Sequence, residues 1–243
     1  MRGPASLRSS ASTCGREQRR RVSHPLLASY RAQWPRIGAI IAMIVGGATA
    51  MAARRLTKPQ ILSAANLIAL MAHQYEEYVY PGYFPGQFNR GLFNSDSPRN
   101  YPLNPQTAMV INTCLAYPFY VAPVLFPKKS WLGLAPVLVG WSQIVLHGIV
   151  IPRKAGARYG PGVLTALLLH LPIGIGYITS LGTSLGHERS ISRADWTKGV
   201  VGAVGSAVFG VAVPNMVMRD RNSPYAFTAK QMGPYDIEAI EPA

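Results

Sequence analysis

Residues 130–152 read SWLGLAPVLVGWSQIVLHGIVIP and contain no Asp, Glu, Lys or Arg. A helix needs about 20 predominantly apolar residues to cross the hydrocarbon core of a bilayer. Including this stretch, the chain has six charge-free windows, which are 17 to 29 residues long. The other five lie at 37–53, 59–75, 100–127, 159–187 and 199–218. The pattern predicts an all-α fold, a polytopic transmembrane helical bundle of five to six spans.

The windows also suggest how the chain is divided. We expect membrane spans at about 37–53, 59–79, 106–126, 131–151, 160–183 and 198–217. These spans predict four parts of the chain. They are a basic, disordered tail over 1–36, a first span or signal-like segment over 37–53, a membrane helical domain over 59–218 and a polar C-terminal tail over 219–243.

The N-terminal segment has several interpretations. Residues 1–36 contain eight Arg and one acidic residue, Glu17. The segment can be the cytoplasmic tail of an uncleaved first span, the basic region of a cleaved signal or an organelle transit sequence. Translation starting at Met51 is a further alternative, because a basic pair followed by a span is an ordinary start for a membrane protein. These alternatives leave open whether residues 1–50 belong to the mature protein.

The charge composition supports a membrane protein. Charged residues make up 14% of the chain, against about 25% in ordinary soluble domains. A net charge of +14 would suggest nucleic-acid binding in a soluble chain, but here the basic residues lie in the tail and in short segments between apolar windows, as in cytoplasmic loops. We therefore expect an integral, multi-pass protein whose partner is the lipid bilayer and not nucleic acid. The two cysteines, Cys14 and Cys114, form no CxxC pair and suggest no disulfide framework.

Alternating traversal of the membrane places several polar residues at a similar depth. His73, Glu76 and Glu77 lie at one end of the second expected span, and His147 lies near the same membrane face in the fourth. Tyr159 opens the next span from that face. Ionisable groups at the edge of a bilayer are costly, so a group of them is a candidate functional site. Alternatively, these residues are only interfacial, where a helix leaves the membrane.

The spacing within the motif favours metal or acid–base chemistry. In HQYEE (73–77), offsets of three and four residues put the imidazole and both carboxylates on one helix face. An imidazole and a carboxylate one turn apart can bind the same metal ion. We expect His73, Glu76 and His147 to hold a divalent metal, Fe, Mn or Zn, which would activate water or O₂. Glu77 is then a general base, a further ligand or a group that orients His73, and Tyr159 is a proton donor or substrate contact.

These motifs resemble a known family. An early His-x-x-Glu-Glu at 73–77, followed by His147 and then by Tyr-x-Pro-Gly at 159–162, is similar to the HXXEE domain family of integral membrane proteins. The family pattern has Asn where this chain has Gln143 and Gly160. The resemblance extends over about residues 59–183. It implies a membrane-embedded site of enzymatic character and names no substrate.

Other residues have simpler interpretations. His170 lies eight residues after Gly162, about 12 Å further along a helix, so we expect it to lie too deep to share the site. Gly202, Ser206 and Gly210 form a stripe of small residues for helix packing. Segment 80–105, rich in aromatic residues, is a candidate lid over the site or a bilayer-interface anchor.

The leading hypothesis is an enzyme with a metal-assisted or acid–base site near one bilayer face, acting on a hydrophobic or lipid-like substrate. The alternatives are a proton-coupled transporter, which would use the same ionisable residues as a relay, and a non-enzymatic membrane scaffold. A site near one face argues against a carrier, since carriers usually bind substrate near the midplane.

Overall fold

The computed structural model describes residues 24–183 and 191–236, and all regular secondary structure in these ranges is helical. Internal contacts divide the chain into a short unit, Met1–Gln33, and a main unit, Trp34–Ala243. The described part of the short unit is the beginning of helix α2, which runs from Pro25 to Ala52. This helix starts within the segment expected to be a disordered tail. The main unit contains every residue of the candidate site.

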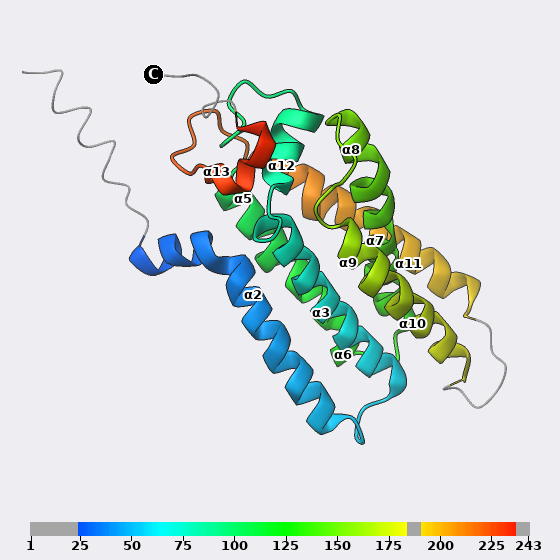
Figure 1. Ribbon diagram of the computed structural model, residues 1–243. Helices are drawn as coiled ribbons and strands as arrows, with labels where there is room; N and C mark the ends of the chain where they lie inside the picture. The colour runs from blue at the N-terminus through cyan, green and yellow to red at the C-terminus, as the bar shows by residue number, and fades with distance from the viewer. Residues whose placement is uncertain (1–23, 184–190, 237–243) are drawn as a thin grey trace, which may run out of the picture. The chain divides into compact units, whose positions relative to one another are not determined.

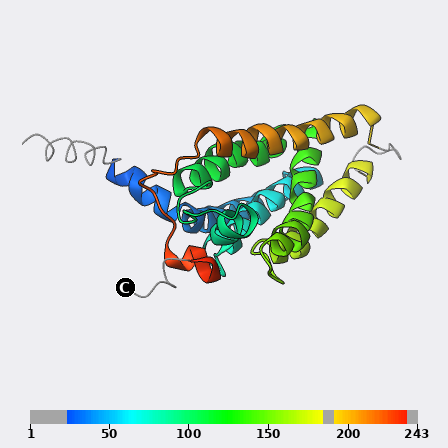
Figure 2. The same ribbon diagram turned by 90° about the horizontal axis from the view of Figure 1, so that it is seen from above.

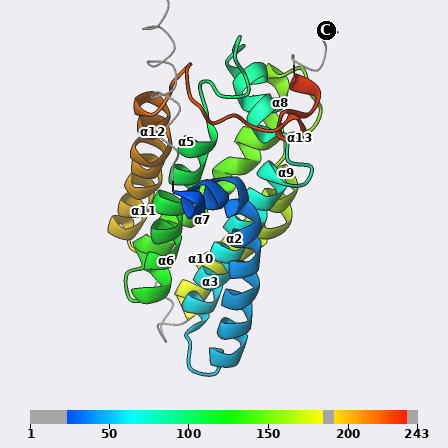
Figure 3. The ribbon, with the colours of Figure 1, turned by 90° about the vertical axis from the view of Figure 1, so that its left-hand side faces the viewer.

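In the part of the chain that the structure describes, five helices are long and apolar enough to cross a membrane. They are α2 and four helices at Pro105–Leu125, Ser130–Lys154, Val163–Gly182 and Arg193–Val217. Figures 1 and 3 show the long helices of the main unit running side by side. These helices confirm the predicted all-α bundle of five to six spans.

Each of the last four long helices contains a π-helical segment between α-helical ones. The first of these helices consists of α5 (Pro105–Met109), η3 (Val110–Leu115) and α6 (Ala116–Leu125), and the second of α7 (Ser130–Val145), η4 (Leu146–Val150) and α8 (Ile151–Lys154). The third consists of α9 (Val163–Thr165), η5 (Ala166–His170) and α10 (Leu171–Thr183), and the fourth of α11 (Arg193–Gly205), η6 (Ser206–Ala212) and α12 (Val213–Val217). Such segments are rare and occur frequently at functional sites. Here His147 lies in η4 and His170 ends η5.

Helix α3 (Lys58–Tyr78) differs from the five membrane-length apolar helices. Its 21 residues span about 31 Å, but its polar side chains keep it outside the apolar set. Those side chains are buried inside the bundle, because α3 packs between α6 and α10. A capping box between Thr57 and Gln60 and a proline in the first turn fix where α3 begins. The neighbouring helices therefore shield a polar helix that would be costly to expose to lipid.

Two apolar clusters hold the main unit together. In one, Leu67, Leu70 and Met71 of α3 pack with Tyr120 of α6. The other joins α7 to α10 through buried residues that include Leu134 and Tyr177. Because lipid tails are as apolar as these side chains, the clusters stabilise the bundle through close packing and not through removal of apolar surface from water.

The last long helix packs closely against α7 in its first half only. A Cβ added at Gly199 would lie 2.8 Å from the Leu134 Cβ, and one at Gly202 would lie 3.0 Å from the Ala135 Cβ. These glycines therefore allow the helices to approach closely. Figures 2 and 3 show this helix, drawn in orange, at the edge of the bundle. Its second half, which carries the other members of the small-residue stripe, lines a cavity.

Short elements cover one end of the bundle. They are α4 (Phe84–Gly86), η2 (Gln87–Leu92), α13 (Ala229–Met232) and η7 (Gly233–Tyr235). The buried Asn89 amide donates to the Pro98 and Leu103 carbonyls at 2.7 and 2.8 Å. Arg99 pairs with Asp236 at 2.7 Å. The Asn89 bonds hold the segment expected to be a lid together, and the Arg99–Asp236 pair ties it to the C-terminal part of the described chain.

Candidate metal-binding site

Three buried side chains converge at the end of α3. The Glu77 Oε1 atom lies 3.5 Å from His73 Nε2 and 3.2 Å from His147 Nε2. The exposed fractions of His73, Glu77 and His147 are only 4%, 6% and 2%. One ligand atom from each residue lies within 4.8 Å of the others. This group, the His-Glu-His triad, can hold a metal ion.

Hydrogen bonds orient the first histidine of the triad. His73 Nδ1 lies 3.1 Å from Thr165 Oγ1, and this hydroxyl lies 2.6 Å from Glu76 Oε2. The carboxylate only accepts, so the hydroxyl donates its proton to Glu76 and accepts from Nδ1–H. In the neutral imidazole, His73 Nε2 is then unprotonated, with its lone pair toward Glu77. A carboxylate that fixes a histidine ring in this way is typical of metal sites.

Glu76 points away from the triad, toward the start of α9. Its Oε1 accepts from the Tyr159 hydroxyl at 2.5 Å and from the Leu164 N–H at 3.2 Å. Its Oε2 accepts from the Thr165 N–H at 2.8 Å in addition to the hydroxyl. Backbone N–H groups at a helix start favour a negative charge. Both Glu76 oxygens are therefore occupied by donors from the segment 159–165.

Tyr159 contacts the site only through Glu76. Burial, and then the neighbouring Glu76 carboxylate, raise the pKa of the Tyr159 phenol above its ordinary value. The phenol therefore stays protonated and donates to Glu76. Tyr159 and Glu76 are both absent from the residues that line the adjoining cavity.

Gly162 brings the start of α9 against the histidines. Its φ of +108° lies in the left-handed region that favours glycine. A Cβ at this position would lie 2.6 Å from His73 Cε1 and 2.9 Å from His147 Nδ1. Glycine is thus required here both by the backbone turn and by the space that the two rings occupy.

A cavity of about 750 Å³ adjoins the triad. His73, Glu77, His147 and His170 line it, and most of its other lining residues are apolar. The walls come mainly from α3, α6, α7 and α11, from the π-helical segments η3, η4 and η6, and from the covering elements α4 and η2. The cavity can therefore surround a hydrophobic molecule and present it to the buried polar group.

The segment 80–105 covers part of this cavity. The ring of Phe84 lies 5.1 Å from the His147 ring, measured between centroids, and 5.5 Å from the Phe88 ring. Both phenylalanines line the cavity. The segment expected to be a lid thus supplies an aromatic wall beside the triad.

His170 lies closer to the site than we expected. Its ring centroid is 5.7 Å from that of His73, and it lines the same cavity. The expected depth was measured along one helix from Gly162, whereas His73 itself contacts Thr165, only five residues before His170. Asn66, two turns before His73 on α3, shares the His73 face and accepts a hydrogen bond from His170 Nδ1 at 2.8 Å. That spacing is the sequence signal that could have placed His170 in the site.

The structure brings together all five residues singled out in the sequence. The triad contains His73, Glu77 and His147, while Tyr159 bonds to Glu76 beside it. Sequence reasoning missed Thr165, whose hydroxyl links His73 to Glu76. A threonine in the first turn of a helix is common, so no pattern distinguishes this one.

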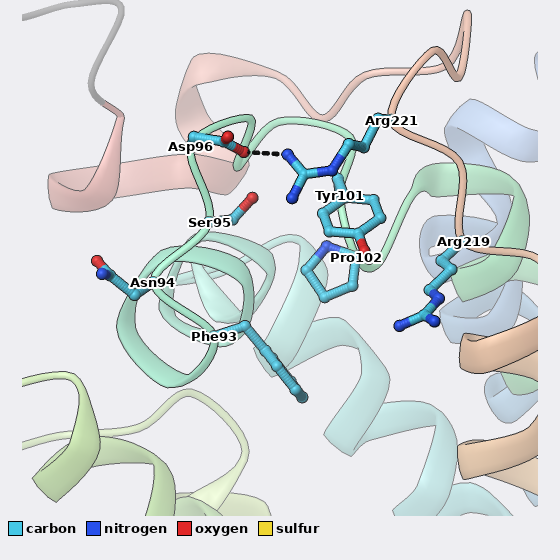
Figure 4. A pocket seen from close by; sticks show the side chains of 8 residues that line it. All are labelled: Phe93, Asn94, Ser95, Asp96, Tyr101, Pro102, Arg219 and Arg221. Atoms are coloured by element: carbon cyan, nitrogen blue, oxygen red, sulfur yellow. Dashed lines mark hydrogen bonds and ion pairs between the residues drawn. The ribbon is translucent and has the colours of Figure 1, made fainter.

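A second pocket, of about 340 Å³, lies on the surface of the covering segments. Its lining residues, shown in Figure 4, include Phe93, Asp96, Tyr101, Arg219 and Arg221. Arg221 donates to Asp96 at 2.5 Å and its guanidinium lies 4.3 Å from the centre of the Tyr101 ring. This pocket is polar and exposed, in contrast to the cavity beside the triad.

Comparison with known proteins identifies the family of the central domain. The model of the family described as proteins of unknown function with an HXXEE motif matches residues 64–177. The match over residues 64–177 confirms the resemblance seen in the sequence. No curated protein and no solved structure matches the chain.

Proposed function

We propose that this protein is a multi-pass integral membrane enzyme in which the His-Glu-His triad binds a divalent metal beside a cavity for a hydrophobic or lipid-like substrate. The observation that most directly supports metal binding is the distance of 3.5 Å between His73 Nε2 and Glu77 Oε1. In the neutral imidazole with its proton on Nδ1, both of these atoms are acceptors, and a cation between them would stabilise the arrangement.

The donor set suits a transition metal. Two imidazole nitrogens and one carboxylate oxygen favour Zn²⁺, Fe²⁺ or Mn²⁺ over Ca²⁺ or Mg²⁺. Such an ion would supply Lewis acidity and activation of water or O₂. We assign Glu77, and not Glu76, as its carboxylate ligand, because both Glu76 oxygens already accept hydrogen bonds.

The two remaining residues then act through their neighbours. Glu76 holds His73 in the required tautomer through Thr165, and Tyr159 holds Glu76 in place. Both are positioning residues in this proposal, since neither lines the cavity. The apolar walls would bury the reacting group of a substrate away from bulk water, which strengthens electrostatic interactions with the triad.

Metal content of the purified full chain tests this proposal. The protein, purified in detergent without chelators and incubated with Zn²⁺, Fe²⁺ or Mn²⁺, is analysed by elemental mass spectrometry. We expect close to one ion per chain in the wild type, and a loss of more than about 100-fold in affinity in His147→Ala, which removes a ligand. Gln143→Ala is the matched control, because Gln143 lies one turn before His147 and lines the same cavity.

Gln143→Ala should retain the ion. A folded wild type that binds none of the three metals would overturn the metal proposal. So would a His147→Ala variant with wild-type affinity.

A further inference from the structure

His170 is a third buried histidine at the cavity, and the triad does not use it. Only 1% of the residue is exposed. Its carbonyl accepts from the Trp141 Nε1–H at 3.2 Å, which fixes the backbone at the end of η5. A Cβ added at Gly140 of α7 would lie 2.6 Å from the His170 Nδ1, so the glycine at this position leaves room for the ring.

Asn66 sets the protonation of this ring. Its amide oxygen lies 2.8 Å from His170 Nδ1. An amide oxygen only accepts, so Nδ1 carries the proton and Nε2 carries a lone pair. Nε2 is buried and has no hydrogen-bond partner among the described residues. A buried acceptor without a donor is costly, and such a group calls for an explanation.

The cavity wall offers acceptors and few free donors. Three lining hydroxyls already donate hydrogen bonds to backbone carbonyls. Ser142 donates to the Val139 carbonyl at 2.7 Å, Ser206 to that of Ala203 at 2.8 Å and Tyr120 to that of Pro136 at 3.2 Å. A second lining residue, Asn215, has a buried Oδ1 that no described residue contacts with a donor. A ligand that pairs with these two acceptors, His170 Nε2 and Asn215 Oδ1, must bring its own donor.

We propose that the cavity binds an amphiphile with a hydroxyl group, whose O–H donates to His170 Nε2. The substrate class is a long-chain or otherwise lipophilic alcohol. The inference rests on the proposed function, in that it places this hydroxyl beside the His-Glu-His triad. His170 is the residue that selects the alcohol over an equally apolar molecule without a donor.

Photoaffinity labelling of the full chain in lipid nanodiscs tests the selection. The probes are a diazirine-bearing hexadecanol and its methyl ether, which has the same chain and an oxygen that cannot donate. We expect the wild type to favour the alcohol by about fivefold, the effect of one neutral hydrogen bond. Labelled peptides should map to the cavity walls.

Variants assign the preference to His170. His170→Leu should label equally with both probes while its ether labelling matches the wild type, which also shows that the cavity is intact. His170→Gln should keep part of the preference, because its amide oxygen can accept at a similar reach. If His170→Leu does not fold, Asn66→Leu tests the same point by releasing the fixed tautomer, and it should lower the preference.

Metal content measured on the same samples separates this inference from the proposed function. A metal-bound wild type with no alcohol preference, or a His170→Leu variant that keeps the preference, would overturn the inference alone. Alcohol preference in a wild type that binds no metal would overturn the metal proposal alone.

Discussion

The cavity beside the triad and the surface pocket use similar charged groups in opposite environments. In the surface pocket, the side chains of Asp96 and Arg221 are 74% and 56% exposed. In the triad, Glu77 meets two imidazoles in a site where each residue is almost fully buried. Water screens the surface pair, whereas the buried group is screened little. Changes in the buried site should therefore have large effects and changes in the surface pocket small ones.

The comparison also holds between adjacent residues. Glu76 and Glu77 are consecutive, yet Glu76 accepts four hydrogen bonds from residues 159–165 and Glu77 faces two imidazoles and the cavity. Their separate partners, and not their shared residue type, determine what each contributes.

The largest effect on metal affinity should appear when Glu76 and Glu77 are replaced one at a time. Glu77→Gln should lower metal affinity by more than about 100-fold, because it removes the anionic ligand, with little loss of stability in the metal-free protein. Glu76→Gln should lower metal affinity by only about 10-fold, through a loosened His73. It should also destabilise the fold by about 2–3 kcal/mol, since an amide N–H₂ would face donors. Metal titration and denaturant or thermal unfolding of both variants measure the two effects, and equal losses of affinity would contradict our assignment.

A smaller effect on metal affinity should distinguish two glycines with positive φ. Gly162→Ala should destabilise the protein by about 2–4 kcal/mol, from backbone strain and from the clash with His73, and should weaken metal binding. Gly156→Ala is the matched control: its φ is +64°, and no atom lies within 4 Å of the added Cβ. It should cost about 1–2 kcal/mol and leave metal affinity unchanged. Thermal unfolding with and without metal checks both, and a Gly162→Ala variant that binds metal normally would argue against the close packing at the triad.

The smallest effect should come from the surface pocket. The hydrogen bond from Arg221 lowers the pKa of Asp96 below its ordinary value, so the pair adds stability above the ordinary Asp pKa and loses it as pH falls through the lowered value. Asp96→Asn should lower Tm by less than about 2 °C at pH 7. The difference should shrink as the pH falls below about 4 and vanish below the lowered pKa of Asp96. Metal content should not change. A large drop in Tm or a loss of metal would show that this pocket supports the triad.

The helical bundle could be predicted from the sequence because charge-free length is a direct physical requirement of a membrane span. Hydropathy is a weaker guide for α3, which is long enough to cross a bilayer but more polar than the five apolar helices. Its polar residues are tolerated because neighbouring helices bury them. Hydropathy along one segment does not report which neighbours surround it.

The sequence by itself determined that the chain is helical, that most of its helices suit a bilayer and that His73, Glu76 and Glu77 share one helix face. These properties depend on local composition and on the helical repeat. Only the tertiary structure decided that Glu77 joins the two histidines, that Glu76 serves the 159–165 segment and that His170 reaches the same cavity. The physical reason is that these roles depend on how α3 is rotated and set in depth against the start of α9 and against η4 and η5, and packing between helices fixes that arrangement.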